Sequence, residues 1–146
     1  MYQKIMVPVD LEHPEGMQKA LEVVADLAAH YRATVCYFGI AEKTPDRVAR
    51  TPEAYVGVLA DFARQQSEKY GIESESKAVA SVDVPAEMDK TLVRVASEVG
   101  ADLIVMASHI PGFADRMHLM SSHATHVARK APMSVFIVRP NGHGKR

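Results

Sequence analysis

The chain has 146 residues, of which 47% are hydrophobic and 24% charged, the proportions of a soluble globular domain and not of a disordered protein. This length suffices for one domain with a continuous core and is too short for two. The formal net charge is −1, so no overall positive field attracts nucleic acid or an anionic membrane surface. We expect one domain over residues 1–140, followed by a flexible, locally basic tail over residues 141–146.

Cysteine usage and the N-terminal segment favour a cytoplasmic protein. Cys36 is the single cysteine and cannot form an internal disulfide. It lies in the apolar run "ATVCYFGI", which predicts a buried and unreactive thiol. No stretch has the length and hydrophobicity of a signal peptide core or a membrane span. We therefore expect no membrane insertion and no nucleic-acid partner.

The first half of the chain alternates between strand and helix patterns. Continuous apolar runs rich in β-branched residues predict buried strands, and apolar residues at a spacing of three or four predict helices. In chain order, we expect a strand over Lys4–Val9, a helix from Pro14 to Tyr31, a strand over Ala33–Ala41 and a helix from Tyr55 that ends at Gly71.

The second half continues the alternation. A polar stretch, Glu73–Ser81, predicts a strand near a sheet edge, and apolar runs predict two buried strands. The remaining elements are expected as a helix over Val84–Gly100, a strand over Ala101–Ser108, a short helix over Ser121–Ala131 and a last strand over Met133–Val138. This order predicts an α/β fold: a five-stranded parallel sheet, doubly wound and sandwiched by helices.

In such sheets, ligands bind beyond the carboxyl ends of the strands, where the strand order reverses. Asp10, Ile40 and the segment Ala107–His109 all fall at predicted carboxyl ends, so we expect them to converge. Two interpretations of Asp10 stay open. It contacts a ligand, or it caps the turn before Pro14.

The chain offers little to support catalysis or a metal centre. His123 and His126 are spaced i,i+3 on a predicted helix, with His109 and His118 nearby in the sequence. No cysteine accompanies them and no His-Glu-x-x-His pattern exists, so we expect no metal site. The chain also lacks the Gly-x-Ser-x-Gly and Walker-type motifs, which favours a protein that is not an enzyme.

Three stretches together resemble the universal stress protein family. They are "KIMVPVD" at the start, "ADLIVMASH" after the third helix, and "SSHATHVARKAPMSVFIVRP", which is similar to the family's "GSVAEKVLRHAPCPVLVVRP". The resemblance implies a Rossmann-like sheet of order 3-2-1-4-5, of the adenine nucleotide alpha hydrolase-like type. It also implies a homodimer joined through the last strand, Met133–Val138, and ATP or AMP as ligand, with Mg²⁺ as the accompanying ion.

The resemblance also implies a set of ligand contacts. Asp10 and Ile40 stand where family members hold the adenosine. The family's phosphate loop is Gly-x-x-Gly, nine residues, Gly-Ser/Thr. Aligned from the following helix, its positions here are Ala107, Ile110, Ser121 and Ser122, and the segment Pro111–Met120 is one residue longer than the pattern. Counting forwards would instead place Met120 and Ser121 at the last two positions. "ASHIP" is closest to a branch of the family with "ASHRP" at this point. The full implied set is Pro8, Val9, Asp10, Ile40, Met106, Ala107, Ser108, His109, Ser121, Ser122 and His123.

The altered loop leaves two functions open. Glycine lets backbone N–H groups approach a phosphate, so its loss predicts a weakened site and a stress-response regulator that binds its nucleotide weakly. The alternative is a nucleotide-free homodimer that acts as a protein-interaction module or a transporter-regulating subunit. Its contact surface for an unidentified partner would be the apolar loop side chains Ile110, Phe113, Met117, Leu119 and Met120.

Overall fold

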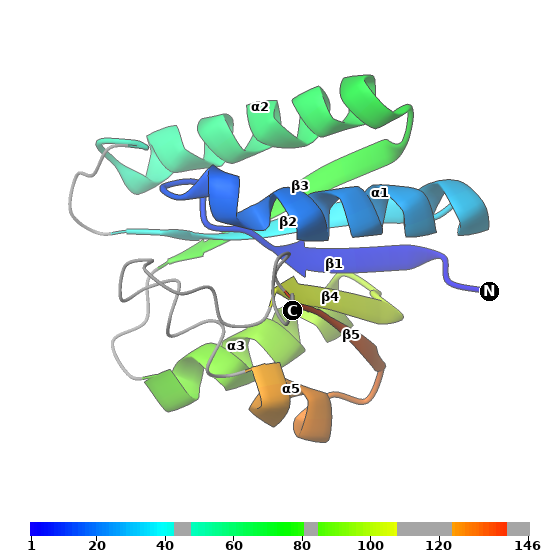
Figure 1. Cartoon of the computed structure of the whole chain (residues 1–146). Helices are drawn as coiled ribbons and strands as arrows, with labels where there is room; N and C mark the ends of the chain where they lie inside the picture. The colour runs from blue at the N-terminus through cyan, green and yellow to red at the C-terminus, as the bar shows by residue number, and fades with distance from the viewer. Residues whose placement is uncertain (43–47, 81–84, 108–123, 140–146) are drawn as a thin grey trace, which may run out of the picture.

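A computed structural model shows a five-stranded sheet between two layers of helices (Figure 1). It describes residues 1–42, 48–80, 85–107 and 124–139. Within these, the elements are β1 (Lys4–Pro8), the 3-10 helix η1 (Pro14–Met17), α1 (Gln18–Tyr31), β2 (Thr34–Ala41), α2 (Pro52–Tyr70), β3 (Glu73–Ala80), α3 (Pro85–Glu98), β4 (Leu103–Ala107), α5 (Ala124–Lys130) and β5 (Ser134–Val138). The predicted phosphate loop and the predicted tail lie outside the described residues.

The sheet has the order β3-β2-β1-β4-β5 and every pairing is parallel, as predicted. β1 and β2 are almost completely buried, because helices cover both faces of a parallel sheet. β3 lies at one edge and all of its residues are exposed or partly exposed, which confirms the prediction from its polarity. β5 forms the other edge, where Phe136 is 42% exposed.

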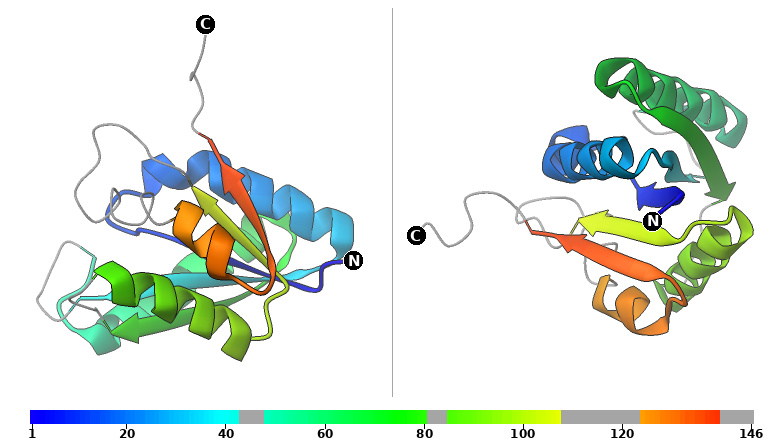
Figure 2. Two further views of the ribbon diagram at one scale, coloured as in Figure 1. Left: turned by 90° about the horizontal axis from the view of Figure 1, so that it is seen from below. Right: turned by 90° about the vertical axis from the view of Figure 1, so that its right-hand side faces the viewer.

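The helices divide into two layers (Figure 2). α1 and α2 cover one face of the sheet, and their core includes Val7, Val24, Tyr37 and Leu59. α3 and α5 cover the other face over a second core. Successive side chains of a buried strand point to opposite faces of the sheet and so pack in the two cores in turn. The α3/α5 core contains Met6, Cys36, Phe38 and Ile104. This two-sided burial explains why these strands are continuous apolar runs in the sequence.

Local sequence explains where the helices begin and end. The Thr51 hydroxyl caps α2 by accepting a hydrogen bond from the Ala54 N–H at 3.0 Å, and Pro52 takes the first helical position. α2 ends at Gly71 in the left-handed conformation, at φ 66°. α1 ends in the same conformation at Arg32, with φ 57°.

At the amino edge of the sheet, Asp102 ties β4 to β1. Its carboxylate accepts hydrogen bonds from the Gln3 N–H at 2.9 Å and the Lys4 N–H at 3.1 Å, while its own N–H donates to the Lys4 carbonyl. The two central strands are therefore closely joined at this end. Toward the opposite, carboxyl end, the described β1–β4 pairing does not extend beyond Met6 and Ile104.

Candidate functional site

β1 and β4 form the point where the strand order reverses, and their pairing is short. The described ladder between them joins Ile5 to Leu103 and Met6 to Ile104. On its other side, β1 pairs with β2 as far as Pro8 opposite Phe38. The two central strands thus separate toward their carboxyl ends, which is the position of ligand sites in open α/β sheets.

Pro8 provides the physical reason for this separation. Backbone groups of successive strand residues face opposite neighbours. The Val9 N–H donates to the Phe38 carbonyl at 2.8 Å, so odd-numbered residues of β1 face β2. The Lys4 carbonyl accepts from Asp102, so even-numbered residues face β4. Pro8 is an even-numbered residue and therefore faces β4. Because proline has no N–H, it cannot donate the next hydrogen bond of the ladder between β1 and β4.

Asp10 follows directly and organises the turn that leads to η1. It is 2% exposed. Its Oδ1 accepts a hydrogen bond from the Glu12 N–H at 3.0 Å, and its carbonyl accepts one from the His13 N–H at 3.1 Å. Its Oδ2 lies 3.4 Å from Nδ1 of His13. The interpretation of Asp10 as a turn cap is therefore confirmed, and its contact with a ligand stays a prediction.

The other predicted site residues that the structure describes surround this point. Continuing the register beyond Pro8 and Phe38 brings Asp10 level with Ile40. Val9 is buried against the α1/α2 core, and Ile40 against the α3/α5 core. Met106 is buried on the α3/α5 side, whereas Ala107 is partly exposed at the end of β4. The structure thus brings the strand-end residues to one edge. Ser108, His109, Ser121, Ser122 and His123 lie outside the described residues.

The turn after β1 contains a donor set that the sequence analysis did not predict. Asp10, Glu12 and His13 each offer a ligand atom, and these atoms all lie within 4.8 Å of one another. Two carboxylates and an imidazole suit a divalent cation. The "DLEH" spacing was visible in the sequence. However, the spacing alone does not show that the side chains of Asp10, Glu12 and His13 meet. Their ligand atoms come together only in the folded turn.

His126, in contrast, lies far from this turn in the fold. It sits on α5, on the other face of the sheet, with Nδ1 3.4 Å from Oδ2 of Asp89 in α3. The structure therefore pairs one of the predicted candidate histidines with a carboxylate between two helices. His109, His118 and His123 lie outside the described residues.

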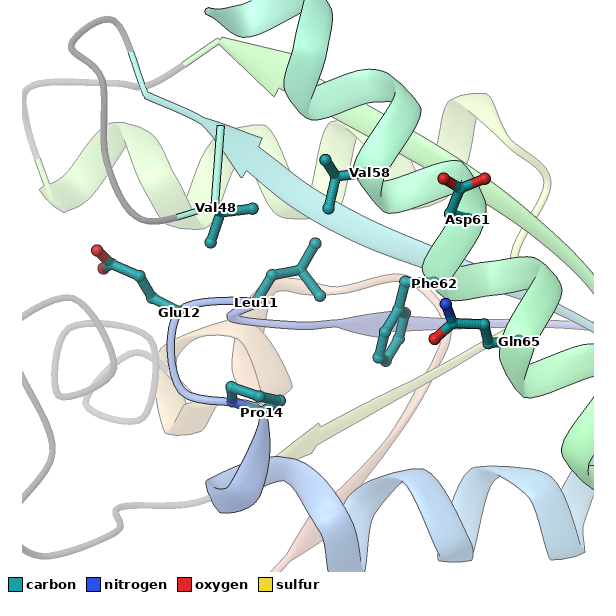
Figure 3. A pocket seen from close by; sticks show the side chains of 8 residues that line it. All are labelled: Leu11, Glu12, Pro14, Val48, Val58, Asp61, Phe62 and Gln65. Atoms are coloured by element: carbon teal, nitrogen blue, oxygen red, sulfur yellow. The ribbon is translucent and has the colours of Figure 1, made fainter. Parts of the chain in front are cut away.

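An open groove lies beside the Asp10 turn, on the α1/α2 side (Figure 3). Its volume is about 700 Å³. In Figure 3, Leu11 points up from the turn toward α2, where Val58 and Phe62 point back toward it. Of the predicted site residues that the structure describes, none lines this groove. It touches the turn through Leu11, Glu12 and Pro14 and also contains Val48, Asp61 and Gln65.

Cys36 cannot act as a nucleophile in the folded state. It is fully buried on β2, as predicted. Burial, with a smaller contribution from the negative charge of Glu75, raises the pKa of its thiol to about 11. The thiol stays protonated at neutral pH, so it lacks the reactive thiolate form.

Among the helices that the structure describes, none combines the length and hydrophobicity needed to cross a membrane.

The sequence from residue 1 to residue 139 matches the model of the universal stress protein family. The chain belongs to this family. Its fold, a parallel sheet with the strand order described above, agrees with that membership. No significant match was found among curated proteins.

Solved structures of other universal stress proteins share the fold. One from Burkholderia pseudomallei is 21% identical, with a TM-score of 0.65 over 94% of this chain and 96% of that one. A universal stress protein in complex with cAMP is also 21% identical, with a TM-score of 0.65 over 94% and 97%. One from Archaeoglobus fulgidus in complex with dAMP is 22% identical, with a TM-score of 0.62 over 93% and 97%.

Proposed function

We propose that this universal stress protein binds an adenine nucleotide, ATP or AMP, at the carboxyl edge between β1 and β4. The observation that carries the proposal is the buried Asp10 carboxylate, placed where Pro8 ends the pairing of the two central strands. Two proteins of the same fold are in complex with cAMP and dAMP, which supports an adenine ligand.

In this proposal, Asp10 accepts a hydrogen bond from the ribose. Its Oδ2 faces His13 at 3.4 Å, longer than the usual separation of about 2.9 Å, so this contact is weak and a ribose hydroxyl can replace it. Ile40, next to the last residue of β2, would lie beside the adenine. The phosphates would lie along Ala107–His109 and Ser121–His123, and Mg²⁺ would accompany a triphosphate.

We expect weak binding, because Ile110 and Ser121 replace glycines of the family's phosphate loop. The protein would then act as a regulator and not as an enzyme. Nucleotide binding would change which partner the homodimer recruits in the stress response, in the cytoplasm. The homodimer would form through Met133–Val138, where the exposed Phe136 lies on an edge strand.

Isothermal titration with ATP and with AMP, each with and without Mg²⁺, tests the proposal. The variants are Asp10→Asn, which keeps an acceptor for the Glu12 N–H, and Asp26→Asn as a matched control, an exposed aspartate of α1. We expect micromolar binding to the wild type and to Asp26→Asn, and a loss of tenfold or more for Asp10→Asn. A folded wild type that gives no heat would favour the nucleotide-free interaction module.

A further inference from the structure

The pairing of β4 with β5 determines which backbone groups of β5 face away from the sheet. The Asp102 N–H donates to a β1 carbonyl, so even-numbered residues of β4 face β1 and odd-numbered ones face β5. Leu103 is odd-numbered and lies level with Ser134. In a parallel ladder a residue bonds to the two residues that flank its level partner, which are here Met133 and Val135. Odd-numbered residues of β5 therefore face β4.

The even-numbered residues Ser134, Phe136 and Val138 face the outer edge, where β5 has no neighbouring strand in the sheet (Figure 2). Such a row of N–H and C=O groups is a template for pairing with another strand. The sequence has proline at positions 132 and 140, each four residues from Phe136, and proline cannot donate to a ladder. The row available for pairing is therefore short and centred on Phe136.

A second copy of the chain complements this row. Two identical strands related by a two-fold axis pair antiparallel, and opposite residues that face each other exchange both of their backbone hydrogen bonds. With the axis at Phe136, Ser134 lies opposite Val138 of the second copy, so all three outward residues are paired. A shift of the axis by one residue would place one outward residue of each strand opposite a proline.

An open cavity lies beside the amino end of this edge. Its volume is about 540 Å³, and it is lined by Ser97, Ala101, Asp102, Pro132, Met133 and Ser134. Asp102 is the only charged residue in this lining. Its carboxylate accepts hydrogen bonds from two backbone N–H groups of the chain start, but it forms no ion pair with any residue that the structure describes. The cavity thus offers a carboxylate to a cation.

Arg139 is the cation that the two-fold pairing brings to this cavity. It is exposed and has no carboxylate partner within the described part of the chain. Continuing the pairing by one residue places Arg139 opposite Met133 of the second copy. Val135 and Ile137 pack against the α3/α5 core, so the alternation of side chains directs Arg139 to the same face of the sheet. α3 contributes to the lining of the cavity, which therefore lies on that face too.

We propose that this cavity receives Arg139 of a second copy, whose guanidinium pairs with Asp102. Two strand spacings separate the two backbones, roughly 10 Å, and the extended side chains of an arginine and an aspartate together span that distance. The aliphatic stem of the arginine would lie across Met133, and its planar fork would meet the carboxylate. The inference rests on the homodimer of the proposed function and specifies which residues of the two copies meet.

Disulfide formation in the full chain tests the register. Phe136→Cys should give a disulfide-linked dimer under mild oxidation, because the Cα atoms of a hydrogen-bonded antiparallel pair lie about 5.5 Å apart. Ser134→Cys is the matched control and should stay unlinked, since the two copies of this residue would lie at opposite ends of the paired segment. The native Cys36 is fully buried and gives no background. A disulfide in Ser134→Cys but not in Phe136→Cys would overturn the register.

A double-mutant cycle tests the ion pair. Arg139→Gln and Asp102→Asn each remove one charge, and the asparagine keeps an oxygen that accepts the Lys4 N–H. We expect each substitution to raise the dissociation constant of the dimer about fivefold or more, and the double variant to raise it no further. Sedimentation of the full chain over a range of concentrations measures this constant. Arg64→Gln, an exposed arginine on α2, is the control and should leave it unchanged.

The outcomes separate the proposals. Effects of Arg139→Gln and Asp102→Asn that multiply in the double variant would show that the two charges do not meet, and they would overturn this inference within an intact dimer. A wild type that stays monomeric at every concentration would refute the homodimer and this pairing together. The nucleotide site is tested separately by the titration with AMP.

Discussion

Nδ1 of His13 lies 3.4 Å from Oδ2 of Asp10, at the carboxyl end of the central strand. Both side chains are largely buried, Asp10 completely and His13 at 17% exposure. The imidazole therefore occupies the side of the carboxylate on which we expect a ribose. In the proposed complex, a nucleotide and His13 would compete for the same oxygen.

His13→Ala should strengthen AMP binding, because it removes this competitor from Asp10. A hydrogen bond contributes a net free energy of about 0.5–1.5 kcal/mol, and a long one lies at the low end of this range. Removing it should therefore raise the affinity for AMP roughly two- to fivefold. Isothermal titration measures it, with His30→Ala, an exposed histidine near the end of α1, as the control. A lower affinity of His13→Ala than of the wild type would show that His13 holds the nucleotide instead.

Gly39→Ala should destabilise the protein. An added Cβ would lie only 3.0 Å from Cε1 and Cζ of Tyr55 and still closer to its hydroxyl oxygen, so the buried Tyr55 ring or the α2 backbone that carries it must shift. We expect a loss of about 1–3 kcal/mol in the free energy of unfolding, measured by urea denaturation. Gly57→Ala is the matched control, because a Cβ there meets nothing within 4 Å. This exposed helical position should gain about 0.5–1 kcal/mol.

The Cys36 thiol should make stability depend on alkaline pH. Its pKa is raised by burial from the ordinary value of 9.0 to about 11, so the folded state holds this proton more tightly than the unfolded state. The resulting stabilisation is complete below pH 9 and is lost as the pH rises toward 11. Urea denaturation of the wild type and of Cys36→Ala across this window isolates the effect. Parallel pH profiles for the two proteins would contradict it.

Phe136→Glu should convert the proposed homodimer into a monomer. Phe136 is 42% exposed on the edge strand β5, where a charged residue opposes strand pairing. Light scattering coupled to size-exclusion chromatography gives the mass. Val56→Glu provides the control, since Val56 is 53% exposed but lies on α2. If Phe136→Glu kept the mass of a wild-type dimer, the interface would lie elsewhere.

The fold was largely predictable from local patterns. Buried parallel strands are continuous apolar runs, so β1, β2 and β4 were found within one or two residues of their ends. The polar sequence of β3 predicted its edge position. The strand order, however, came from the family resemblance, because periodicity alone does not determine which strands are neighbours.

The site was less predictable. Asp10 and Ile40 could be placed at one edge because parallel strands end together, but the donor set with Glu12 and His13 depends on the fold of a single turn. Ile110, which decides the expected affinity, lies outside the described residues.

The location of AMP on the protein is the most direct test of the proposed nucleotide site. Two-dimensional ¹⁵N–¹H NMR of the labelled protein during titration with AMP reports it residue by residue. We predict the largest shift changes at the amides of Asp10, Glu12 and Ile40, at the carboxyl edge, and none at Arg32, Gly71 or Asp102, at the opposite edge. Changes centred on the opposite edge would contradict the proposed nucleotide site.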